Sequence, residues 1–100
     1  PKYFEMGRTF FESLVRYFAV ELAPRGIRVN AVSGGVVDTE ALDHFPQKDR
    51  MIEWGTKRTP AGRLVAPEDI AHAVAFLCSP GADMIRGHVL VVDGGFMLPA

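Results

Sequence analysis

The most telling segment of the chain is Ile27-Arg28-Val29-Asn30-Ala31-Val32-Ser33-Gly34-Gly35, in which apolar and polar side chains alternate before a pair of glycines. Such alternation, rich in β-branched residues, predicts a strand over Ile27–Val32 and a tight turn after it. A second segment, His88-Val89-Leu90-Val91-Val92, is almost wholly apolar and stops at Asp93-Gly94-Gly95. A run of this kind is typical of a strand that is buried on both faces of a sheet.

Three further segments have the spacing of helices. Apolar residues recur every three or four positions over residues 9–22, and Pro24 and Gly26 then supply a stop. Residues 67–78 begin with a proline followed by two acids, which suit the first turn and the positive end of a helix. A shorter helix is expected over about residues 47–57, where apolar residues line one side.

The order helix, strand, loop, helix, strand predicts an α/β fold. The two strands are expected to lie parallel, joined by a right-handed crossover through the helix over residues 67–78. Two strands cannot bury two helices and their own edges, and a complete doubly wound sheet needs more chain than this. We therefore expect residues 1–100 to form one piece of a Rossmann-like doubly wound parallel sheet, without a second domain.

The composition is that of a globular chain. Of 100 residues, 48% are hydrophobic, and 11 basic side chains face 12 acidic ones, which excludes collagen-like and strongly charged disordered chains. A net charge of −1 offers no basic field for a phosphate backbone, so no nucleic-acid partner is expected. The apolar runs are short, so we expect no membrane span and no signal peptide, and a cytoplasmic location by default.

Cysteine and histidine give no sign of a metal centre. Cys78 is the single cysteine, so it cannot form an internal disulfide, and a buried thiol is expected. His44, His72 and His88 are scattered, without partners at the spacing of metal ligands. No metal site is predicted.

Glycines follow both predicted strands, where ligands bind in open parallel sheets. Gly34-Gly35 would let a ligand approach the backbone, and Thr39 offers a hydroxyl suited to an amide or phosphate oxygen. A glycine turn with a capping threonine explains the same residues equally simply.

A set of linked motifs sharpens this interpretation. The segments are Ala19–Gly35, Asp38-Thr39, Thr59–Arg63, Pro67–Ala71, Phe76–Ser79, Ile85–Gly87 and Val91–Gly95. In order and spacing they resemble the C-terminal part of the short-chain dehydrogenase/reductase family, from about Glu12 onward. Residues 33–35, 38–46 and 82–87 look most like the NADPH-dependent enoyl-acyl-carrier-protein reductases of bacterial fatty-acid synthesis.

The resemblance implies an oxidoreductase that reduces an enoyl thioester with NADPH or NADH. It implies that Gly35, Val37 and Thr39 bind the nicotinamide end of the cofactor, and that residues 38–58 cover an acyl thioester substrate. The apolar members of that loop could line an acyl channel, although for any one of them ordinary packing is the favoured interpretation. These members are Leu42, Phe45, Met51, Ile52 and Trp54.

The N-terminal residues depart from the family pattern. The family's catalytic lysine position falls on Arg8, whose guanidinium is no conservative replacement for an ammonium. The tyrosine position falls on Phe4 or Pro1, neither of which carries a hydroxyl, and Tyr3 fits neither spacing. Phe10-Phe11 stand where the family has small residues, and two rings there would overpack a native site by about 1–3 kcal/mol. No catalytic residue is therefore assigned, and no turnover is expected of the isolated chain.

The resemblance also implies that the Val-Asp-Gly-Gly segment ends the sheet, so Asp93 is expected to serve structure. Arg63 and Arg86 are expected to pair with Glu68 or Asp83 in exposed contacts worth about 0–1 kcal/mol.

The alternative function is a non-catalytic oligomerisation module. In the family, the helix that corresponds to residues 14–22 forms a bundle with a second copy, and the last helix and strand build another two-fold contact. A homo-oligomer is therefore expected under either function, and the open edges of the two strands would also favour pairing.

Overall fold

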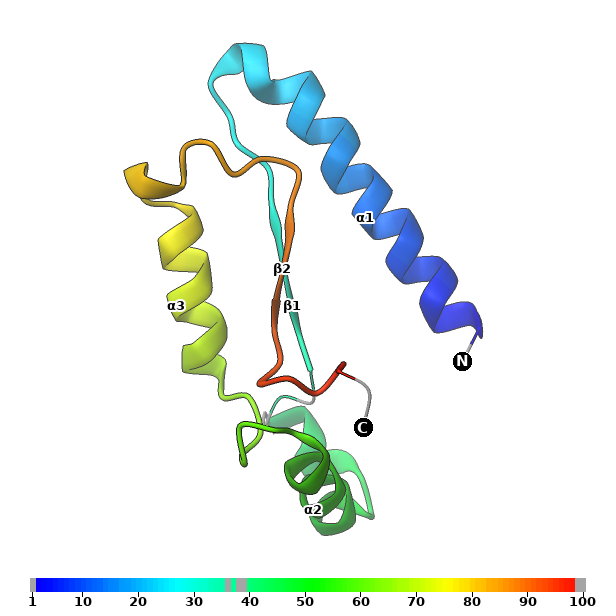
Figure 1. Ribbon diagram of the computed structural model, residues 1–100. Coiled ribbons are helices and arrows are strands. Elements are labelled where there is room, and N and C mark those ends of the chain that lie inside the picture. Colours follow the sequence, from blue (N-terminus) through cyan, green and yellow to red (C-terminus); the bar gives the residue numbers. More distant parts are fainter. Residues whose placement is uncertain (1, 36, 38–39, 99–100) are drawn as a thin grey trace. The chain divides into compact units, whose positions relative to one another are not determined.

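The structure, a computed structural model, describes residues 2–35, 37 and 40–98, with the backbone alone for residues 2–7, 41 and 42. Two strands and three α-helices alternate with three short 3-10 helices (Figure 1). In chain order they are α1 (Lys2–Leu22), η1 (Ala23–Arg25), β1 (Ala31–Gly34), η2 (Glu40–His44), α2 (Lys48–Arg58), α3 (Pro67–Leu77), η3 (Pro80–Ala82) and β2 (Val89–Val92).

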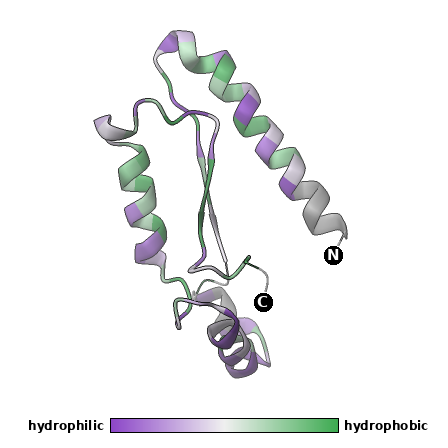
Figure 2. Cartoon of the chain, in the orientation of Figure 1, coloured by the Kyte–Doolittle hydropathy of each residue, from purple (hydrophilic) through white to green (hydrophobic). Residues whose placement is uncertain are grey.

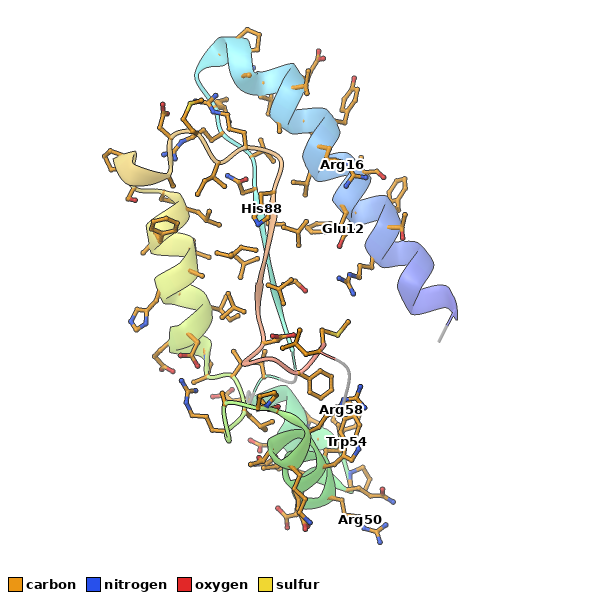
Figure 3. All side chains as sticks on the ribbon, viewed as in Figure 1. Glu12, Arg16, Arg50, Trp54, Arg58 and His88 are labelled. Carbon is orange, nitrogen blue, oxygen red and sulfur yellow. The ribbon has the colours of Figure 1, made fainter. Side chains whose placement is uncertain are left out.

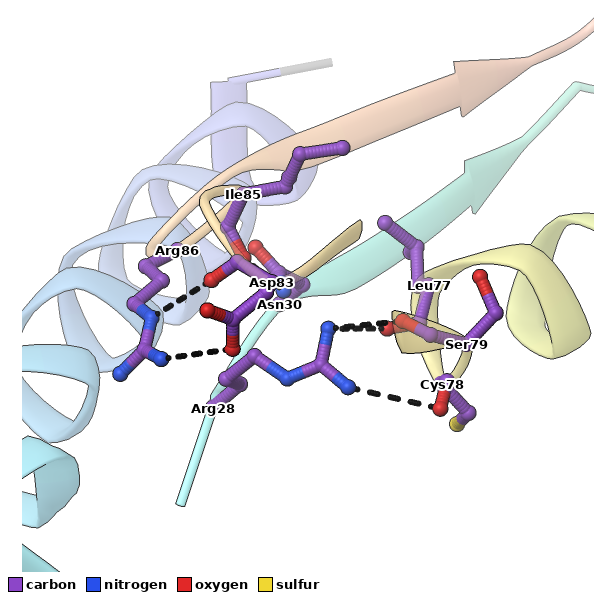
Figure 4. A network of polar contacts seen from close by, with 8 residues as sticks. All are labelled: Arg28, Asn30, Leu77, Cys78, Ser79, Asp83, Ile85 and Arg86. Atoms are coloured by element: carbon purple, nitrogen blue, oxygen red, sulfur yellow. Dashed lines mark hydrogen bonds and ion pairs between the residues drawn. The ribbon is translucent and has the colours of Figure 1, made fainter. Parts of the chain in front are cut away.

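The strands β1 and β2 are neighbours in one sheet and point in the same direction (Figure 4). Helix α3 lies between them in the sequence, as a crossover between parallel strands requires. The fold class expected from the sequence, part of a Rossmann-like parallel α/β sheet, is confirmed. The chain divides into two compact units, residues 1–31 with 75–90 and residues 32–74 with 91–100.

In the first unit, α1 packs against the loop before β2 through small residues. Val15 and Ala19 are the buried residues on its described part. A Cβ on Gly87 would stand 3.4 Å from the Ala19 Cβ and 3.7 Å from the Arg16 Cα. Because Gly87 also has a φ of +69°, both its conformation and its close approach to α1 require glycine.

Two polar side chains before β1 tie the first unit together (Figure 4). Arg28 donates to the carbonyls of Leu77 at 3.1 Å, Cys78 at 3.4 Å and Ser79 at 3.2 Å. These carbonyls lie at the end of α3, where they lack partners within the helix and favour a positive charge. Asn30 donates to the Ile85 carbonyl at 2.8 Å and accepts from a backbone amide in the same loop.

The predicted strand over residues 27–32 is therefore partly wrong, because β1 covers Ala31–Gly34. Backbone bonds from Gly87 to Val29 at 2.8 Å and from Ala31 to His88 at 2.9 Å join the two segments. Within residues 27–30, the side chains of Arg28 and Asn30 also bond to distant backbone groups, which alternation in the sequence does not reveal. The turn accordingly begins at Gly35, later than the sequence indicated.

In the second unit, the segment after α2 supplies buried side chains. Thr59, Leu64 and Val65 are each less than one-tenth exposed. Val65 also forms an isolated parallel bridge with Val37, beyond the end of β1. These contacts place the loop that follows α2 next to the loop that follows β1.

The helices over residues 47–57 and 67–78 are confirmed to within a residue as α2 and α3. Helix α1 begins at Lys2, earlier than the expected Thr9. Figure 2 shows mostly hydrophobic residues along α3 and β2, and mostly hydrophilic ones along α2. Among the described helices, none has the length and apolar character that a membrane span requires.

Two burial expectations are corrected. Strand β2 is not buried on both faces within the described chain, because Val91 is 46% exposed. Cys78 is exposed; it follows the last residue of α3, and its carbonyl accepts from Arg28. Phe10 and Phe11 are 66% and 56% exposed, and their overpacking of a native site stays a prediction.

Candidate functional site

The turns that follow β1 and β2 are in direct contact. A Cβ on Gly35 would stand 3.1 Å from the Asp93 Cβ and 3.4 Å from the Phe96 Cβ. Gly35 therefore lies at the end of β1, where the sequence placed it, and protein packing already requires its lack of a side chain. Two explanations for this glycine are therefore compatible with its position: it lets a ligand approach the backbone, or it lets the two turns pack against each other.

Val37 is half-buried, and its isolated parallel bridge to Val65 anchors the chain just beyond the turn. The third predicted cofactor residue, Thr39, lies outside the described residues. The structure thus brings Gly35 and Val37 to the end of β1, and their role in binding a cofactor stays a prediction.

Asp93 closes the turn after β2. It is 7% exposed, and its two carboxylate oxygens accept from the amides of Gly95 at 2.8 Å and Met97 at 2.9 Å. With one strong acceptor bond on each oxygen, the side chain is committed to the turn. This is the structural role that the sequence analysis expected for it.

Two glycines in that turn contact the segment after α2. Gly94 and Gly95 have φ angles of +64° and +94°, and a Cβ on either would stand 2.8 Å from a carbon of Thr59 or Pro60. The amide of Ala61 also donates to the Gly94 carbonyl at 3.0 Å. The end of α2 is therefore pinned to the turn after β2, so the loop predicted to cover the substrate has a fixed C-terminal end.

Helix α2 carries an aromatic and cationic cluster near that end (Figure 3). The rings of Trp54 and Phe96 meet edge to face, with centroids 5.5 Å apart. The Arg58 guanidinium carbon lies 5.4 Å from the Trp54 centroid and 5.0 Å from the Phe96 centroid. The spacing of four residues between Trp54 and Arg58 is a signal in the sequence, whereas the part played by Phe96 depends on tertiary contact.

The residues expected near the acyl group have mixed environments. Phe45 and Met51 line an open hollow of about 270 Å³ with Pro46 and Gln47. Phe45 and Trp54 are 52% and 54% exposed, so neither is a buried residue in the described chain. Met51 and Ile52 are half-buried, and the Leu42 side chain lies outside the described residues.

A second open pocket, of about 280 Å³, lies beside the start of α3, with Arg63, Asp69 and His72 among its lining residues. Arg63 donates two bonds to Asp69, at 2.7 and 3.0 Å, and the Ala66 amide donates to Asp69 at 2.8 Å. The Arg63 guanidinium, with help from this amide, holds the pKa of Asp69 well below its usual range. The same pairing raises the pKa of Arg63.

The expected ion pairs are half right. Arg86 pairs with Asp83 at 3.2 Å, but Arg63 pairs with Asp69 instead of Glu68. Asp69 is the third residue of α3, from which a carboxylate reaches back to the amide that precedes the helix. That position brings the Asp69 carboxylate to Arg63. Glu68, the preceding residue, does not pair with Arg63 in the structure.

The N-terminal part of α1 offers no assembled acid-base pair among the described side chains. Arg8, which the resemblance places at the family's lysine position, forms an ordinary helix pair with Glu12 at 3.1 Å. Pro1 and the side chains of Tyr3 and Phe4 lie outside the description. Within the described residues, no group of histidines, cysteines and acids could hold a metal ion.

Known proteins match this chain over most of its length. Residues 4–97 match the family model described as enoyl-(acyl carrier protein) reductase. The chain is 42% identical, over its whole length, to 1-cyclohexenylcarbonyl-CoA reductase of Streptomyces collinus, of which it covers 37%. It is 39% identical, again over its whole length, to the NADH-dependent enoyl-acyl-carrier-protein reductase of Escherichia coli, of which it covers 39%.

Solved structures agree with the sequence matches. A protein of Thermus thermophilus is 40% identical and superimposes with a TM-score of 0.79 over 91% of this chain and 38% of its own. A proposed 2-deoxy-D-gluconate 3-dehydrogenase of Agrobacterium tumefaciens, solved with bound NADP, is 40% identical with a TM-score of 0.71, over 88% of this chain and 36% of its own. The chain thus spans under two-fifths of the length of these relatives. By its motifs, its parallel strands and these matches, it belongs to the short-chain dehydrogenase/reductase family.

Proposed function

We propose that this chain is part of an NAD(P)H-dependent oxidoreductase that reduces the carbon-carbon double bond of an enoyl thioester. The observation that carries the proposal is the match of residues 4–97 to the enoyl-(acyl carrier protein) reductase model. The names of two relatives point to the same chemistry, since both are reductases of unsaturated or enoyl acyl groups.

The described residues at the end of β1 fit the nicotinamide end of such a cofactor. Gly35 presents backbone without a side chain, and Val37 follows it as a half-buried residue anchored to Val65. Backbone N–H and C=O groups at this end of a parallel sheet are the partners that a carboxamide requires. Thr39 would add a hydroxyl from the same loop.

When bound, the cofactor supplies a hydride to the β-carbon of the enoyl thioester, and a proton then completes the saturated product. This chain's part is to hold the nicotinamide end at Gly35, Val37 and Thr39, and to shelter the acyl group with the loop before and along α2. The hollow lined by Phe45 and Met51 offers an apolar surface for that group.

The test uses the protein that contains this chain, with an enoyl thioester and either NADPH or NADH, and follows the loss of nicotinamide absorbance. We expect cofactor oxidation with the enoyl thioester and none with its saturated counterpart. Oxidation with ketones or sugars alone would contradict the proposal.

A substitution tests the cofactor residues separately. Thr39→Val should weaken NADPH or NADH binding by about threefold to tenfold, the loss of one hydrogen bond, when measured by nicotinamide fluorescence. Thr9→Val, on the exposed face of α1, is the matched control. Equal affinities of the two variants would contradict the role of Thr39.

A second candidate function, an oligomerisation module without catalysis, is favoured by the apolar surface of α1. The side chains of Phe10, Phe11 and Phe18 are each more than two-fifths exposed. A second copy packed on this surface would bury them. A stable dimer by light scattering, with no change in nicotinamide fluorescence at high NADPH, would support this function over the reductase.

A further inference from the structure

Helix α2 presents three residues on one face: Arg50, Trp54 and Arg58, which we call the Arg-Trp-Arg face (Figure 3). Their spacing of four residues stacks them along the helix over about 12 Å of rise. The Trp54 side chain is 54% exposed, and both arginines are exposed. An indole on the surface, with a guanidinium on either side, is therefore open to a ligand.

None of the carboxylates that the structure describes neutralises the positive charge on this face. Lys57 pairs with Glu53 at 3.0 Å, and Lys48 pairs with Asp43. Within the part of the chain that the structure describes, neither Arg50 nor Arg58 has a carboxylate partner. The free cationic groups of α2 are thus confined to the Arg-Trp-Arg face.

Arg58 is held in place by two rings. Its guanidinium carbon lies 5.4 Å from the Trp54 centroid and 5.0 Å from the Phe96 centroid. Contact with ring faces restrains a guanidinium while leaving its N–H groups available. A restrained, unpaired guanidinium is suited to bind a phosphate through two parallel hydrogen bonds.

We propose that the Arg-Trp-Arg face binds the nucleotide portion of a coenzyme A thioester, with the adenine against Trp54 and the phosphates on Arg50 and Arg58. The inference rests on the proposed function, because it names the carrier of the acyl group that the reductase would act on. The adenine of this nucleotide provides an aromatic face for the indole. The phosphates of the nucleotide supply negative charge to pair with the two arginines.

The surrounding charges favour this small ligand over the acidic surface of a carrier protein. Asp49 and Glu53 are exposed on the same helix. A broad acidic protein surface lying along α2 would approach the Asp49 carboxylate, whereas Glu53 is already paired with Lys57, and like charges in contact are unfavourable. A nucleotide can occupy the Arg-Trp-Arg face alone. The apolar hollow at Phe45 and Met51, at the start of the same helix, would suit the uncharged arm of the thioester.

The first experiment measures binding without catalysis. Trp54 is the only tryptophan of the chain, so its fluorescence reports directly on the proposed face. We expect coenzyme A to change this fluorescence saturably, and pantetheine, which lacks the nucleotide, to leave it unchanged. Arg50→Gln should weaken coenzyme A binding by about fivefold or more, because it removes a charge-assisted bond. Lys57→Gln removes the same charge from a paired residue, and should weaken binding by less than about twofold.

Several outcomes would overturn the inference. Equal losses in Arg50→Gln and Lys57→Gln would show unspecific attraction of charge. Competition between coenzyme A and NADH would place the ligand in the cofactor site. A response to an acidic carrier protein, but not to coenzyme A, would assign the face to that protein. Since Arg50 is exposed and none of the described carboxylates forms an ion pair with it, its substitution is not expected to disturb folding.

A kinetic comparison separates this inference from the proposed function. If an enoyl-pantetheine is reduced with the same KM as the enoyl-CoA, and Arg50→Gln changes neither, the inference fails while the reductase stands. If coenzyme A binds in an arginine-dependent way but neither thioester is reduced, the face stands and the proposed function fails. A KM for enoyl-CoA that rises in Arg50→Gln, with unchanged kcat, supports both.

Discussion

Replacing Asp93 by asparagine should destabilise the protein far more than an exposed substitution of the same kind. Each carboxylate oxygen accepts one backbone amide, from Gly95 at 2.8 Å and Met97 at 2.9 Å. An asparagine keeps one acceptor and turns an NH₂ group toward the other amide, so one buried donor loses its partner. Hydrogen bonds to a charged group contribute about 1.5–3 kcal/mol, and we expect Asp93→Asn to cost about 2–3 kcal/mol.

The assay is urea unfolding followed by the fluorescence of Trp54, whose ring contacts Phe96 inside the same turn region. The matched control is Asp83→Asn, which alters an exposed pair with Arg86 and should cost about 0–1 kcal/mol. If the two variants unfold at the same urea concentration, the turn does not depend on the Asp93 carboxylate, and the structural reasoning about this residue is refuted.

Two further substitutions test the geometry of the second unit and of its helix start. Gly95→Ala should lower the free energy of unfolding, measured in urea, by about 1–3 kcal/mol, because Gly95 has a φ of +94° and the new Cβ would stand 2.8 Å from a ring carbon of Pro60. The control is Gly81→Ala, whose Cβ would have no contact closer than 3.8 Å and which should change this free energy by less than about 1 kcal/mol. Equal effects would contradict the close packing. Arg63 lowers the folded pKa of Asp69, so the carboxylate contributes stability above its unfolded pKa of about 4 that is lost as the pH falls below that value. Asp69→Asn should therefore flatten the acid side of the unfolding midpoint against pH, while Glu68→Gln should leave Asp69's contribution intact; an unchanged acid limb in Asp69→Asn would refute the pairing.

Local patterns along the chain predicted most of the secondary structure. Helix α3 begins at Pro67, as the proline followed by two acids indicated, and α2 follows the spacing of its apolar residues. The parallel arrangement of β1 and β2 also followed from the order of the elements, because a strand, helix, strand succession has one common solution. These features depend on residues a few positions apart, which is the range that periodicity covers.

The start of β1 was misplaced because alternation does not say which residues find a backbone partner. Arg28 and Asn30 read as the polar face of a strand, yet they bind carbonyls more than 45 residues away in the sequence. Likewise Cys78 read as a buried thiol at the end of an apolar helix face, and the structure exposes it.

At the candidate site, the positions of the glycines were predictable from the sequence, but the contacts that require glycine at those positions were not. The glycines at 35, 94 and 95 could be located from the sequence as the ends of strands. Only the folded chain shows that Gly35 lies against Asp93 and that Gly95 lies against Pro60. The same holds for Arg58, whose contact with Phe96 joins α2 to the turn after β2. Periodicity and turn chemistry depend on neighbouring residues, so the sequence by itself determined them. Close approach and the pairing of distant groups arise from packing, and only the tertiary structure could decide them.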